Sequence, residues 1–337
     1  MTKKQCLYGV NLGGWLVLEK WMTPSVFQNT TADNEYELVQ VKGGGARLRD
    51  HHDTFIVEAD FRWLRDNGVM AVRIPFGYWI FGDEPPYIGA IEKLDWAVDM
   101  AEKYGLKVLL DLHGAPGAQN EADHSGSGRP KTEKWLHHSG HQERTIEILE
   151  KIAERYYDKT SIWGIELLNE PTLDWSTLRL VHFYRKAYRR LIRVARPGTV
   201  IVFGDGFRPL LLTGALRAHK NFPVIMDSHF YQCFSARDKQ RGPSSHLEKV
   251  RVKRYRQLRY LRQQQPVVVG EWSGVLPQEV YAQMDYRQRI ELRNQYIEAQ
   301  LSTYEAAAGW FYWSYKTEQD DDWNFRFLVD SGNLSLT

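Results

Sequence analysis

The sequence is poor in cysteine, in long apolar runs and in excess charge of one sign, and each absence excludes a class of protein. Only Cys6 and Cys233 occur in 337 residues. Two cysteines are too few for a disulfide framework, and we expect free thiols at opposite ends of the fold. No run of about 18 apolar residues is present, which excludes a transmembrane helix. The net charge of +2 favours neither nucleic acid nor a membrane surface.

Phosphate-binding and targeting motifs are missing as well. No Gly-x-Gly-x-x-Gly joins a strand to a helix, and residues 43–45 lack the Lys-Ser/Thr of a phosphate loop, so we interpret them as a flexible loop tip. Residues 1–4 are basic, but polar residues interrupt the apolar stretch that follows and no cleavage site is present. The sequence as written predicts a cytoplasmic protein, or a secreted one if a native leader is not part of it.

Aromatic residues are abundant, with 12 Trp, 18 Tyr and 14 Phe. Sugar rings stack their C–H faces on flat aromatic side chains, so this abundance fits a carbohydrate site, although aromatics also fill cores. The one basic run, between Lys249 and Arg262, is interrupted by apolar residues at helical spacing. That spacing is typical of a solvated helix face rather than of an electrostatic binding site.

Apolar strand-like runs alternate with amphipathic helical stretches throughout the chain. Runs such as Val267–Val269 are apolar without interruption, which is typical of parallel strands buried on both faces. The strands are expected at 8–13, 70–75, 107–113, 162–169, 200–204, 224–231, 267–271 and 309–315. Helices are expected at 91–104, 145–157, 176–194, 246–264 and 283–306. Eight such units predict a single (β/α)₈ TIM-barrel domain over residues 1–337, with an open doubly wound sheet as the alternative.

Polar residues close several of the predicted strands, where barrel enzymes carry their active sites. Glu170 follows the fourth strand and Glu271 the seventh, and glycoside hydrolysis needs such a pair of carboxyl groups. The other residues near strand ends are Arg73, Asp111, His113, Asn169, His229, Tyr231 and Trp313. The patternless segments 17–54 and 114–140 are long enough to form the walls of a site at this end.

Several motifs resemble glycoside hydrolase family 5, most closely its exo-β-1,3-glucanase branch. They occur in the expected order between residues 9 and 325. The motifs are Gly9-Val10-Asn11-Leu12-Gly13-Gly14-Trp15, Asp111-Leu112-His113-Gly114-Ala115-Pro116-Gly117, Leu168-Asn169-Glu170-Pro171, Gly270-Glu271-Trp272-Ser273 and the stretch from Trp310 to Glu318.

The resemblance implies a retaining mechanism with Glu170 as acid/base and Glu271 as nucleophile, the latter positioned and kept ionised by Arg73 and Tyr231. A nucleophile must be anionic, whereas the acid must be protonated, and the charge of Glu271 would keep Glu170 protonated. It further implies sugar-contacting roles, including the 2-hydroxyl for Asn169 and the terminal hydroxyls for Glu19 and Asp123. The implied substrate-binding residues are Glu19, Arg73, His113, Asp123, Asn169, His229, Tyr231, Phe234 and Trp313.

One departure from the branch concerns the entrance to the site. The exo-glucanases hold the leaving group between two Phe rings; Phe234 matches one of them, but Ala122 stands where the other would be. We therefore expect an exo-acting β-glucosidase or glucanase for β-1,3-linked glucose. The alternatives are a β-1,6-glucanase, a glucosidase for bulky aglycones, a transglycosylase and, more distantly, an inactive glycan-binding barrel.

The remaining polar clusters are expected to have structural roles. No cofactor or metal is expected, and His137, His138 and His141 are interpreted as surface or loop residues rather than as metal ligands. Glu166 has the same strand parity as Glu170 and is predicted to be a buried structural acid with a hydrogen-bonded partner. Residues 320–322, three consecutive aspartates, are predicted to form a solvated loop.

Overall fold

A closed barrel of eight parallel strands forms the centre of the computed structural model, which describes residues 6–125, 135–173 and 177–336. Neighbouring strands pair in chain order, and β8 closes on β1. The strands are β1 (Leu7–Asn11), β2 (Ala71–Gly77), β3 (Lys107–Gly114), β4 (Ile162–Glu166), β5 (Val200–Gly204), β6 (Val224–His229), β7 (Val267–Trp272) and β8 (Gly309–Tyr312). This topology confirms the predicted TIM barrel and excludes the open sheet.

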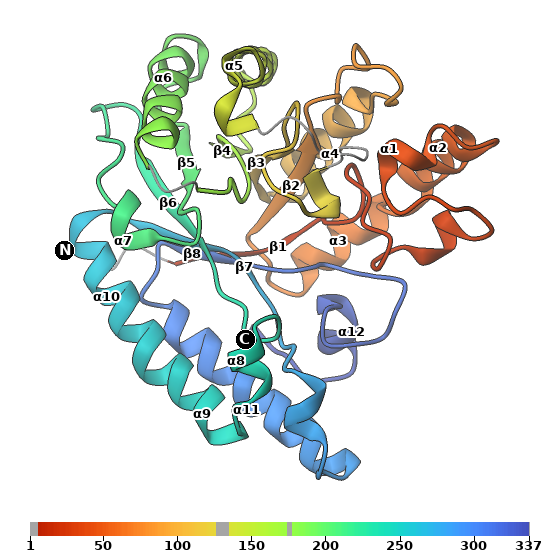
Figure 1. Cartoon of the computed structure of the whole chain (residues 1–337), viewed down its shortest axis with the longest axis vertical. Helices are drawn as coiled ribbons and strands as arrows, with labels where there is room; N and C mark the ends of the chain where they lie inside the picture. Colours follow the sequence, from red (N-terminus) through yellow and green to blue (C-terminus); the bar gives the residue numbers. More distant parts are fainter. Residues whose placement is uncertain (1–5, 126–134, 174–176, 337) are drawn as a thin grey trace.

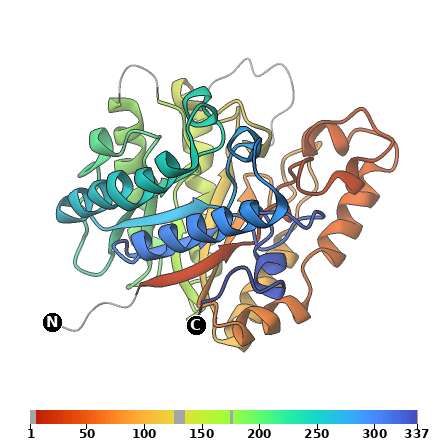
Figure 2. The same cartoon turned by 90° about the horizontal axis from the view of Figure 1, so that it is seen from below.

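Helices return the chain along the outside of the barrel (Figures 1 and 2). The α-helices are α1 (Glu35–Leu38), α2 (Gly44–Thr54), α3 (Glu58–Asp66), α4 (Ile91–Tyr104), α5 (Ser139–Arg155), α6 (Leu178–Val194), α7 (Pro209–Leu212), α8 (Ala236–Lys239), α9 (Pro243–Glu248), α10 (Tyr255–Gln264), α11 (Tyr286–Tyr304) and α12 (Phe325–Asp330). Short 3₁₀ turns are η1 (Pro24–Phe27), η2 (Asp123–Ser125), η3 (Trp135–His137) and η5 (Gln278–Tyr281), and a π-helical segment, η4 (Lys249–Arg254), joins α9 to α10. All five predicted helices are present.

The barrel interior changes from apolar to charged along the strands. Ala71, Leu109 and Ile225 belong to an apolar cluster inside the barrel. Two residues further on, and therefore on the same face of each strand, lie Arg73, Asp111 and Asp227, all buried. The ionisable groups are thus concentrated toward the C-terminal ends of the strands, where barrel enzymes have their sites.

Four strands are shorter than predicted, so several site residues lie in the turns that follow them. β1 ends at Asn11, β4 at Glu166, β6 at His229 and β8 at Tyr312, whereas the predictions extended to 13, 169, 231 and 315. Beyond these points the chain leaves the ladder to form the walls of a pocket. Polar residues in a turn can face the pocket from directions that a strand does not allow.

The prediction that residues 17–54 have little regular structure is wrong. The segment contains α1 and α2, which stand to one side of the barrel in both views (Figures 1 and 2). Residues 43–45 are not a loop tip: Gly43 has a left-handed φ of 79° and caps α2, which begins at Gly44. A Cβ added at Gly44 would lie 1.7 Å from the carbonyl oxygen of Leu38, so the glycine permits this close approach.

The basic run forms part of the continuous helix α9–η4–α10, which packs beside α11 (Figure 2). Lys249 is paired with Asp238 at 2.7 Å, and Arg254 lies over the ring of Phe230 at 4.2 Å. The other basic residues of the run are exposed, as expected for a solvated helix face. Both cysteines are free thiols, as predicted.

A helix that spans a membrane must be both long enough and apolar enough to cross the lipid bilayer. Within residues 6–125, 135–173 and 177–336, none of the helices combines the length and the apolar character that a membrane span requires.

Candidate active site

A pocket of about 550 Å³ lies at the C-terminal ends of the strands. Eight of the predicted site residues line it, namely Glu19, His113, Asp123, Glu170, Tyr231, Phe234, Glu271 and Trp313. The predicted residues Arg73 and Asn169 are fully buried; Arg73 donates to Glu271 and to Asn169, and His229 contacts Glu170. Five further residues line the pocket, namely Trp21, Ala122, His124, Phe207 and Trp323. The segments after β1 and β3 therefore wall the site, as predicted.

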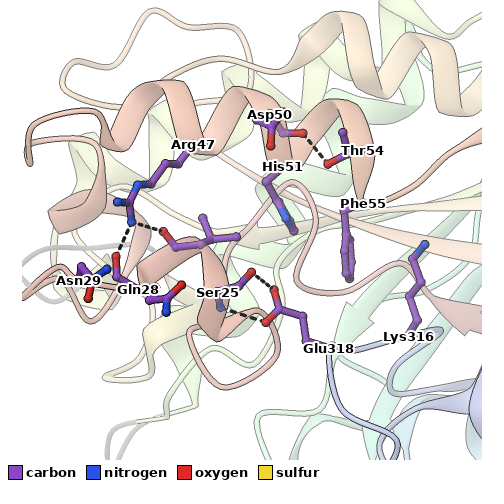
Figure 3. A pocket seen from close by; sticks show the side chains of 11 residues that line it. Ser25, Gln28, Asn29, Arg47, Asp50, His51, Thr54, Phe55, Lys316 and Glu318 are labelled. Carbon is purple, nitrogen blue, oxygen red and sulfur yellow. Dashed lines mark hydrogen bonds between the residues drawn. The ribbon is translucent and has the colours of Figure 1, made fainter.

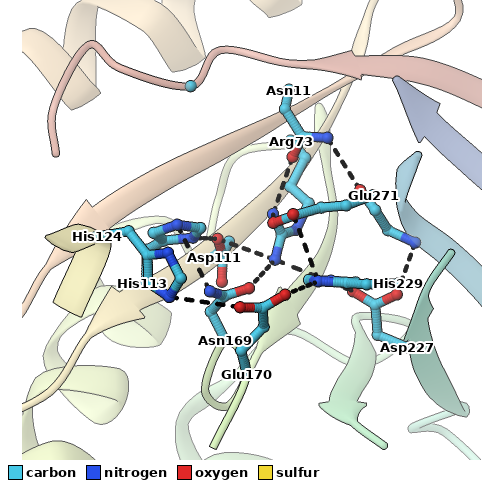
Figure 4. A network of polar contacts seen from close by, with 12 residues as sticks. Asn11, Arg73, Asp111, His113, His124, Asn169, Glu170, Asp227, His229 and Glu271 are labelled. Carbon is cyan, nitrogen blue, oxygen red and sulfur yellow. Dashed lines mark hydrogen bonds and ion pairs between the residues drawn. The ribbon is translucent and has the colours of Figure 1, made fainter. Parts of the chain in front are cut away.

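Arg73 is the centre of the polar network beneath the pocket (Figure 4). Its guanidinium group is fully buried and uses all of its N–H directions. It donates to Glu166 Oε2 at 2.8 Å, Asn11 Oδ1 at 2.9 Å, Asn169 Oδ1 at 2.9 Å and Glu271 Oε1 at 3.1 Å, and it forms an ion pair with Asp111 Oδ2 at 3.1 Å. Glu166 is thereby confirmed as a buried acid with a hydrogen-bonded partner. Burial raises its pKa well above the usual value, and the charge of Arg73 opposes the increase.

Glu271, on β7, is held through both carboxylate oxygens. Oε1 accepts from Arg73, and Oε2 accepts from the hydroxyl of Tyr231 at 2.8 Å. Burial and the nearby charge of Glu170 raise the pKa of Glu271, while His229 and Arg73 oppose the increase. The contacts from Arg73 and Tyr231 are those that the sequence predicted.

Glu170 projects from the turn after β4 with a left-handed backbone, at a φ of 40°. Its Oε1 lies 2.7 Å from Nδ1 of His229, and that nitrogen is also 3.4 Å from Oε2 of Glu271. Nε2 of His229 lies 3.3 Å from Asp227. A carboxylate oxygen of Glu170 and one of Glu271 lie within 4.8 Å of each other. Inverting glycosidases separate their carboxyl groups by about 6.5–9.5 Å, so this spacing suits retention.

The protonation of the two glutamates differs from the sequence-based expectation. We expected Glu170 to be protonated beside an ionised Glu271, but burial is outweighed by the hydrogen bond and charge of His229, which lower the pKa of Glu170 to about 2. The carboxylates around His229 overcome its burial and raise its pKa well above the usual value. Both shifts favour His229 as the donor and Glu170 as the acceptor in their 2.7 Å hydrogen bond.

Three groups of side chains lie close enough together to share a cation, namely Glu19, His113 and His124; Glu166, Asp227 and His229; and Glu170, His229 and Glu271. The pKa of His229, which belongs to two of these groups, is raised well above the usual value by the carboxylates around it, and this disfavours metal ligation because only the neutral ring has a lone pair to offer. Elsewhere, His138 caps α5 by accepting from the backbone N–H of His141. The prediction of a solvated loop at 320–322 is wrong for Asp322, which accepts from Arg293 at 3.1 Å.

The inner end of the pocket is polar and tightly packed. Trp313 stacks on His113 with centroids 5.4 Å apart, and Nδ1 of His113 bonds Asp111 at 2.7 Å. A Cβ at Gly13 would lie 2.9 Å from Trp313, which explains why glycine stands there. Glu19 accepts from the indole N–H of Trp21 at 2.7 Å, and burial raises the pKa of Glu19 to about 7.

The outer end of the pocket is aromatic and exposed. Phe234 is 68% exposed and stacks against Trp323, and Phe207 is 60% exposed. Phe207 has a left-handed φ of 59°, and its N–H donates to Asp205 at 2.7 Å. Sequence reasoning missed Phe207, although Asp205-Gly206-Phe207 directly follows a correctly predicted strand. It also missed His124, Trp21 and Trp323, which lie in segments without a periodic pattern.

A second cavity of about 520 Å³ lies outside the barrel, between α2, η1 and the segment after β8 (Figure 3). Ser25 and Glu318 are hydrogen-bonded across it, and Nε2 of His51 donates to the carbonyl oxygen of Gly14 at 2.7 Å. These bonds brace the segments that carry Glu19 and Trp313 from behind.

The family assignment rests on a match over most of the chain. The profile of glycosyl hydrolase family 5, described as Cellulase, matches residues 33–319. The chain belongs to glycosyl hydrolase family 5. It is therefore a glycoside hydrolase, and enzymes of this family retain the anomeric configuration.

Relatives are similar over nearly the whole chain. The probable glucan 1,3-beta-glucosidase A of Aspergillus niger is 33% identical, over 97% of this chain and 86% of its own length. The glucan 1,3-beta-glucosidase of Schwanniomyces occidentalis is also 33% identical, over 97% and 86% of the two chains. Among solved structures, the rutinosidase of Aspergillus niger superposes with a TM-score of 0.82 at 22% identity, covering 98% of both chains. That likeness supports the fold.

Proposed function

We propose that the protein is an exo-acting, retaining β-glucosidase for β-1,3-linked glucose or related β-glucosides, on a single barrel domain over residues 1–337. The proposal is supported by relatives named glucan 1,3-beta-glucosidases. The observation that carries it is the spacing of Glu170 and Glu271, whose carboxylate oxygens lie within 4.8 Å.

In the first step, Glu271 attacks the anomeric carbon while Glu170 protonates the departing oxygen, giving a covalent glycosyl-enzyme. In the second step Glu170 removes a proton from water, which displaces Glu271. Arg73 and Tyr231 hold Glu271 in line with the anomeric carbon through its two oxygens. The division of roles follows from these contacts, because a nucleophile needs cationic and hydrogen-bonding partners.

The proton for the first step comes from the hydrogen bond between His229 and Glu170. Nδ1 of His229 and Oε1 of Glu170 lie 2.7 Å apart, and two groups this close titrate as a pair. Transfer from Nδ1 to Oε1 converts the imidazolium–carboxylate pair into neutral imidazole and carboxylic acid, with no proton taken from solvent. Formation of the covalent intermediate removes the negative charge of Glu271, which favours Glu170 as a base in the second step.

The polar inner end of the pocket would bind the glucose unit. Asn169 lies beside both Glu170 and Arg73 and would contact the 2-hydroxyl, with Trp313 beneath the ring. Glu19 and Asp123 would bind the terminal hydroxyls and close the pocket to a longer chain. A pocket closed in this way admits only a chain end, so each cycle releases a single glucose.

A second candidate activity, on glucosides with bulky apolar aglycones, is favoured by the aromatic entrance. Ala122 lines the entrance without an aromatic face, whereas the ring of Phe207 lies exposed beside Glu170. An apolar aglycone would gain stacking and burial there.

A hydrolysis panel tests the proposal. We would compare laminari-oligosaccharides, gentiobiose, cellobiose and aryl β-glucosides, follow product anomers by NMR and analyse the earliest products from a long β-1,3-glucan. We expect β-glucose as the first product, released singly. An α-anomer as first product would refute retention, and mixed oligosaccharides early in digestion would refute the exo-acting pocket. Transfer products at high substrate concentration would measure the share of transglycosylation.

A further inference from the structure

The ring of His229 lies between two carboxylates, and each of its nitrogens faces one of them (Figure 4). Nδ1 is 2.7 Å from Oε1 of Glu170, and Nε2 is 3.3 Å from Oδ2 of Asp227. The side chains of His229 and Asp227 are 5% and 0% exposed, so little water competes for their contact. Asp227 lies two residues before His229 on β6, and the two side chains therefore share one face of the strand.

An irregularity between β6 and β7 accommodates the carboxylate of Asp227. The register pairs Asp227 with Val268 but His229 with Glu271, so β7 carries one more residue than β6 over this interval. The backbone N–H of Gly270, within the longer stretch, donates to Oδ1 of Asp227 at 2.6 Å. A Cβ at Gly270 would lie 1.9 Å from Oδ2 of Asp227, so the glycine leaves room for this side chain. The same irregularity places Glu271 opposite His229.

The two carboxylates determine which nitrogens of the ring carry protons. An ionised carboxylate can only accept hydrogen bonds, so a ring nitrogen that is bonded to one must be a donor. Burial raises the pKa of both carboxyl groups, but the charge and hydrogen bonds of His229 outweigh it. The pKa of Asp227 is lowered as a result, and that of Glu170 falls to about 2. Two ionised partners require a proton on both nitrogens, and Asp227 is the partner of the proton on Nε2.

Further ionisable groups from neighbouring elements surround His229 and Asp227. They are Arg73 from β2, His124 from η2, Glu166 from β4, Asp205 from the turn after β5 and Glu271 from β7. Glu271 lies 3.4 Å from Nδ1, so its charge acts on the same ring nitrogen as that of Glu170. Asp227 acts on the opposite nitrogen, where its loss should have a separate effect.

We propose that Asp227 is a positioning residue that keeps His229 doubly protonated, so that His229 can supply the acid/base Glu170 with its proton. The inference rests on the proposed role of Glu170. In the first step the N–H bond at Nδ1 breaks as the O–H bond of Glu170 forms, while Nε2 keeps its proton toward Asp227. Glu170 passes its proton to the glycosidic oxygen as the bond from that oxygen to the anomeric carbon breaks. In the second step Glu170 takes a proton from the attacking water and returns it to Nδ1, so Asp227 undergoes no net change.

The variant that tests the inference is Asp227→Asn. The N–H of Gly270 still requires an acceptor, so it fixes the amide oxygen of the new side chain and turns the amide NH₂ group toward Nε2. A donor in that place leaves no acceptor for a proton on Nε2, and His229 loses that proton. Asp60→Asn is the matched control. Asp60 is also buried, accepts from the backbone N–H of Val57 at 2.8 Å and pairs with Lys316 at 3.0 Å, but it lies on α3 and does not line the pocket.

The first measurement is a long-range proton–nitrogen correlation spectrum of the whole enzyme with isotope-labelled histidines, near neutral pH. The signals of His229 are identified by their absence from His229→Gln. We expect protons on both ring nitrogens in wild type and in Asp60→Asn, and on only one in Asp227→Asn. The wild-type spectrum tests the inference even if Asp227→Asn does not fold, because an unprotonated Nε2 would overturn it.

The second measurement is kcat/KM against pH on laminaribiose, a poor leaving group, and on 2,4-dinitrophenyl β-glucoside, which leaves without protonation. Loss of an anion beside His229 lowers the pKa at which the pair of His229 and Glu170 loses its proton. We expect the basic limb for laminaribiose to move about one pH unit lower in Asp227→Asn, a loss of about tenfold on that side. The dinitrophenyl substrate should lose less than about threefold. A fall in both substrates together, with the limb in place, would show a merely structural role and overturn the inference.

The Glu170→Ala variant separates this inference from the proposed function. If Glu170→Ala affects both substrates equally, Glu170 is not the acid, and the proposed function fails with the inference. If Glu170→Ala impairs laminaribiose selectively while Asp227→Asn keeps the wild-type limb, only the inference fails. Adding Asp227→Asn to Glu170→Ala should reduce the rate on laminaribiose by less than about threefold, since the acid that Asp227 serves is absent.

Discussion

The two ends of the pocket are built in opposite ways. At the inner end, Glu19, His113 and Trp313 are buried, and each is hydrogen-bonded or stacked onto a neighbouring side chain. At the outer end, Phe207 and Phe234 are more than half exposed. A buried polar group left unpaired by the wrong ligand costs several kcal/mol, whereas an exposed ring loses little when a ligand fits poorly.

The contrast predicts strict selection of the sugar and permissive selection of the leaving group. Discrimination should therefore be steep for changes in the glucose unit and shallow for changes in the aglycone. The following substitutions test that contrast, beginning with the reacting groups between the two ends.

Loss of the nucleophile should have the largest effect. Glu271→Ala should lower kcat by about four orders of magnitude or more on every substrate, because no other group can form the covalent intermediate. Glu170→Ala should be comparably severe for laminaribiose but much milder for 2,4-dinitrophenyl β-glucoside. Steady-state kinetics with both substrates measures this, and substantial turnover by Glu271→Ala would contradict the nucleophile assignment.

At the inner end, Glu19→Gln should lower kcat/KM for all glucosides by about 10- to 100-fold, because a carboxylate acceptor for sugar hydroxyls is lost. The matched control is Glu35→Gln. Glu35 is also buried with a pKa raised by burial to about 7, but it contacts Leu18 and Trp79 rather than the pocket. A similar loss of activity in the control would show that the effect is structural.

Glu19→Gln should also make the folded protein more stable than wild type at high pH. Because the pKa of Glu19 is about 7 when folded and near 4.5 when unfolded, its contribution to stability is present below pH 4.5 and is lost as pH rises through 7. Gln stays neutral, so Glu19→Gln should gain about 1–3 kcal/mol in the free energy of unfolding relative to wild type between pH 5 and pH 8. Urea titrations at the two pH values measure the difference, and an equal difference at both would refute it.

At the outer end, Phe207→Ala should lower kcat/KM for aryl glucosides by about 5- to 10-fold, equivalent to about 1 kcal/mol of lost stacking. Laminaribiose should change less, because a sugar buries less aromatic surface. Leu210→Ala provides the control, since Leu210 is exposed on α7 but does not line the pocket. Equal losses of kcat/KM for Phe207→Ala and Leu210→Ala would show that Phe207 does not contact the aglycone at the entrance.

The smallest effect is expected for Ala122→Phe, which adds an aromatic face to the entrance. It should improve kcat/KM for laminaribiose by about 2- to 5-fold and penalise bulky aryl glucosides. If neither substrate responds, a ring at position 122 does not reach the leaving group, and Phe207 alone defines the aromatic side of that subsite.

The barrel and the network beneath the pocket could be predicted from sequence because they depend on regular patterns. Uninterrupted runs such as Val267–Val269 indicate buried parallel strands; Arg73 lies within β2, Glu271 near the end of β7, and Glu170 in the turn after β4. The entrance could not be predicted in the same way. Phe207 takes its position from a left-handed turn held by Asp205, and His124 is held by its contact with Asn120; both depend on local geometry that has no periodicity.

The protonation states of the site residues could not be predicted from the sequence either. The sequence identified two glutamates and a nearby histidine, but the location of the proton depends on which carboxylate lies closer to His229. That difference, 2.7 Å for Glu170 against 3.4 Å for Glu271, arises from the turn after β4. Distances of this kind are set by packing across the barrel.

The five contacts of Arg73 have a consequence for how such an enzyme can diverge. Each N–H of its guanidinium already has a partner on a different strand or turn, so lysine, with three donors on a single ammonium, could satisfy only part of the set. Replacement of any of the five partners leaves a buried N–H group of Arg73 without an acceptor. A second, simultaneous substitution must then supply a new acceptor for that group. We therefore expect these six positions to be inherited as a block, while new substrate preferences evolve through single substitutions around the rim.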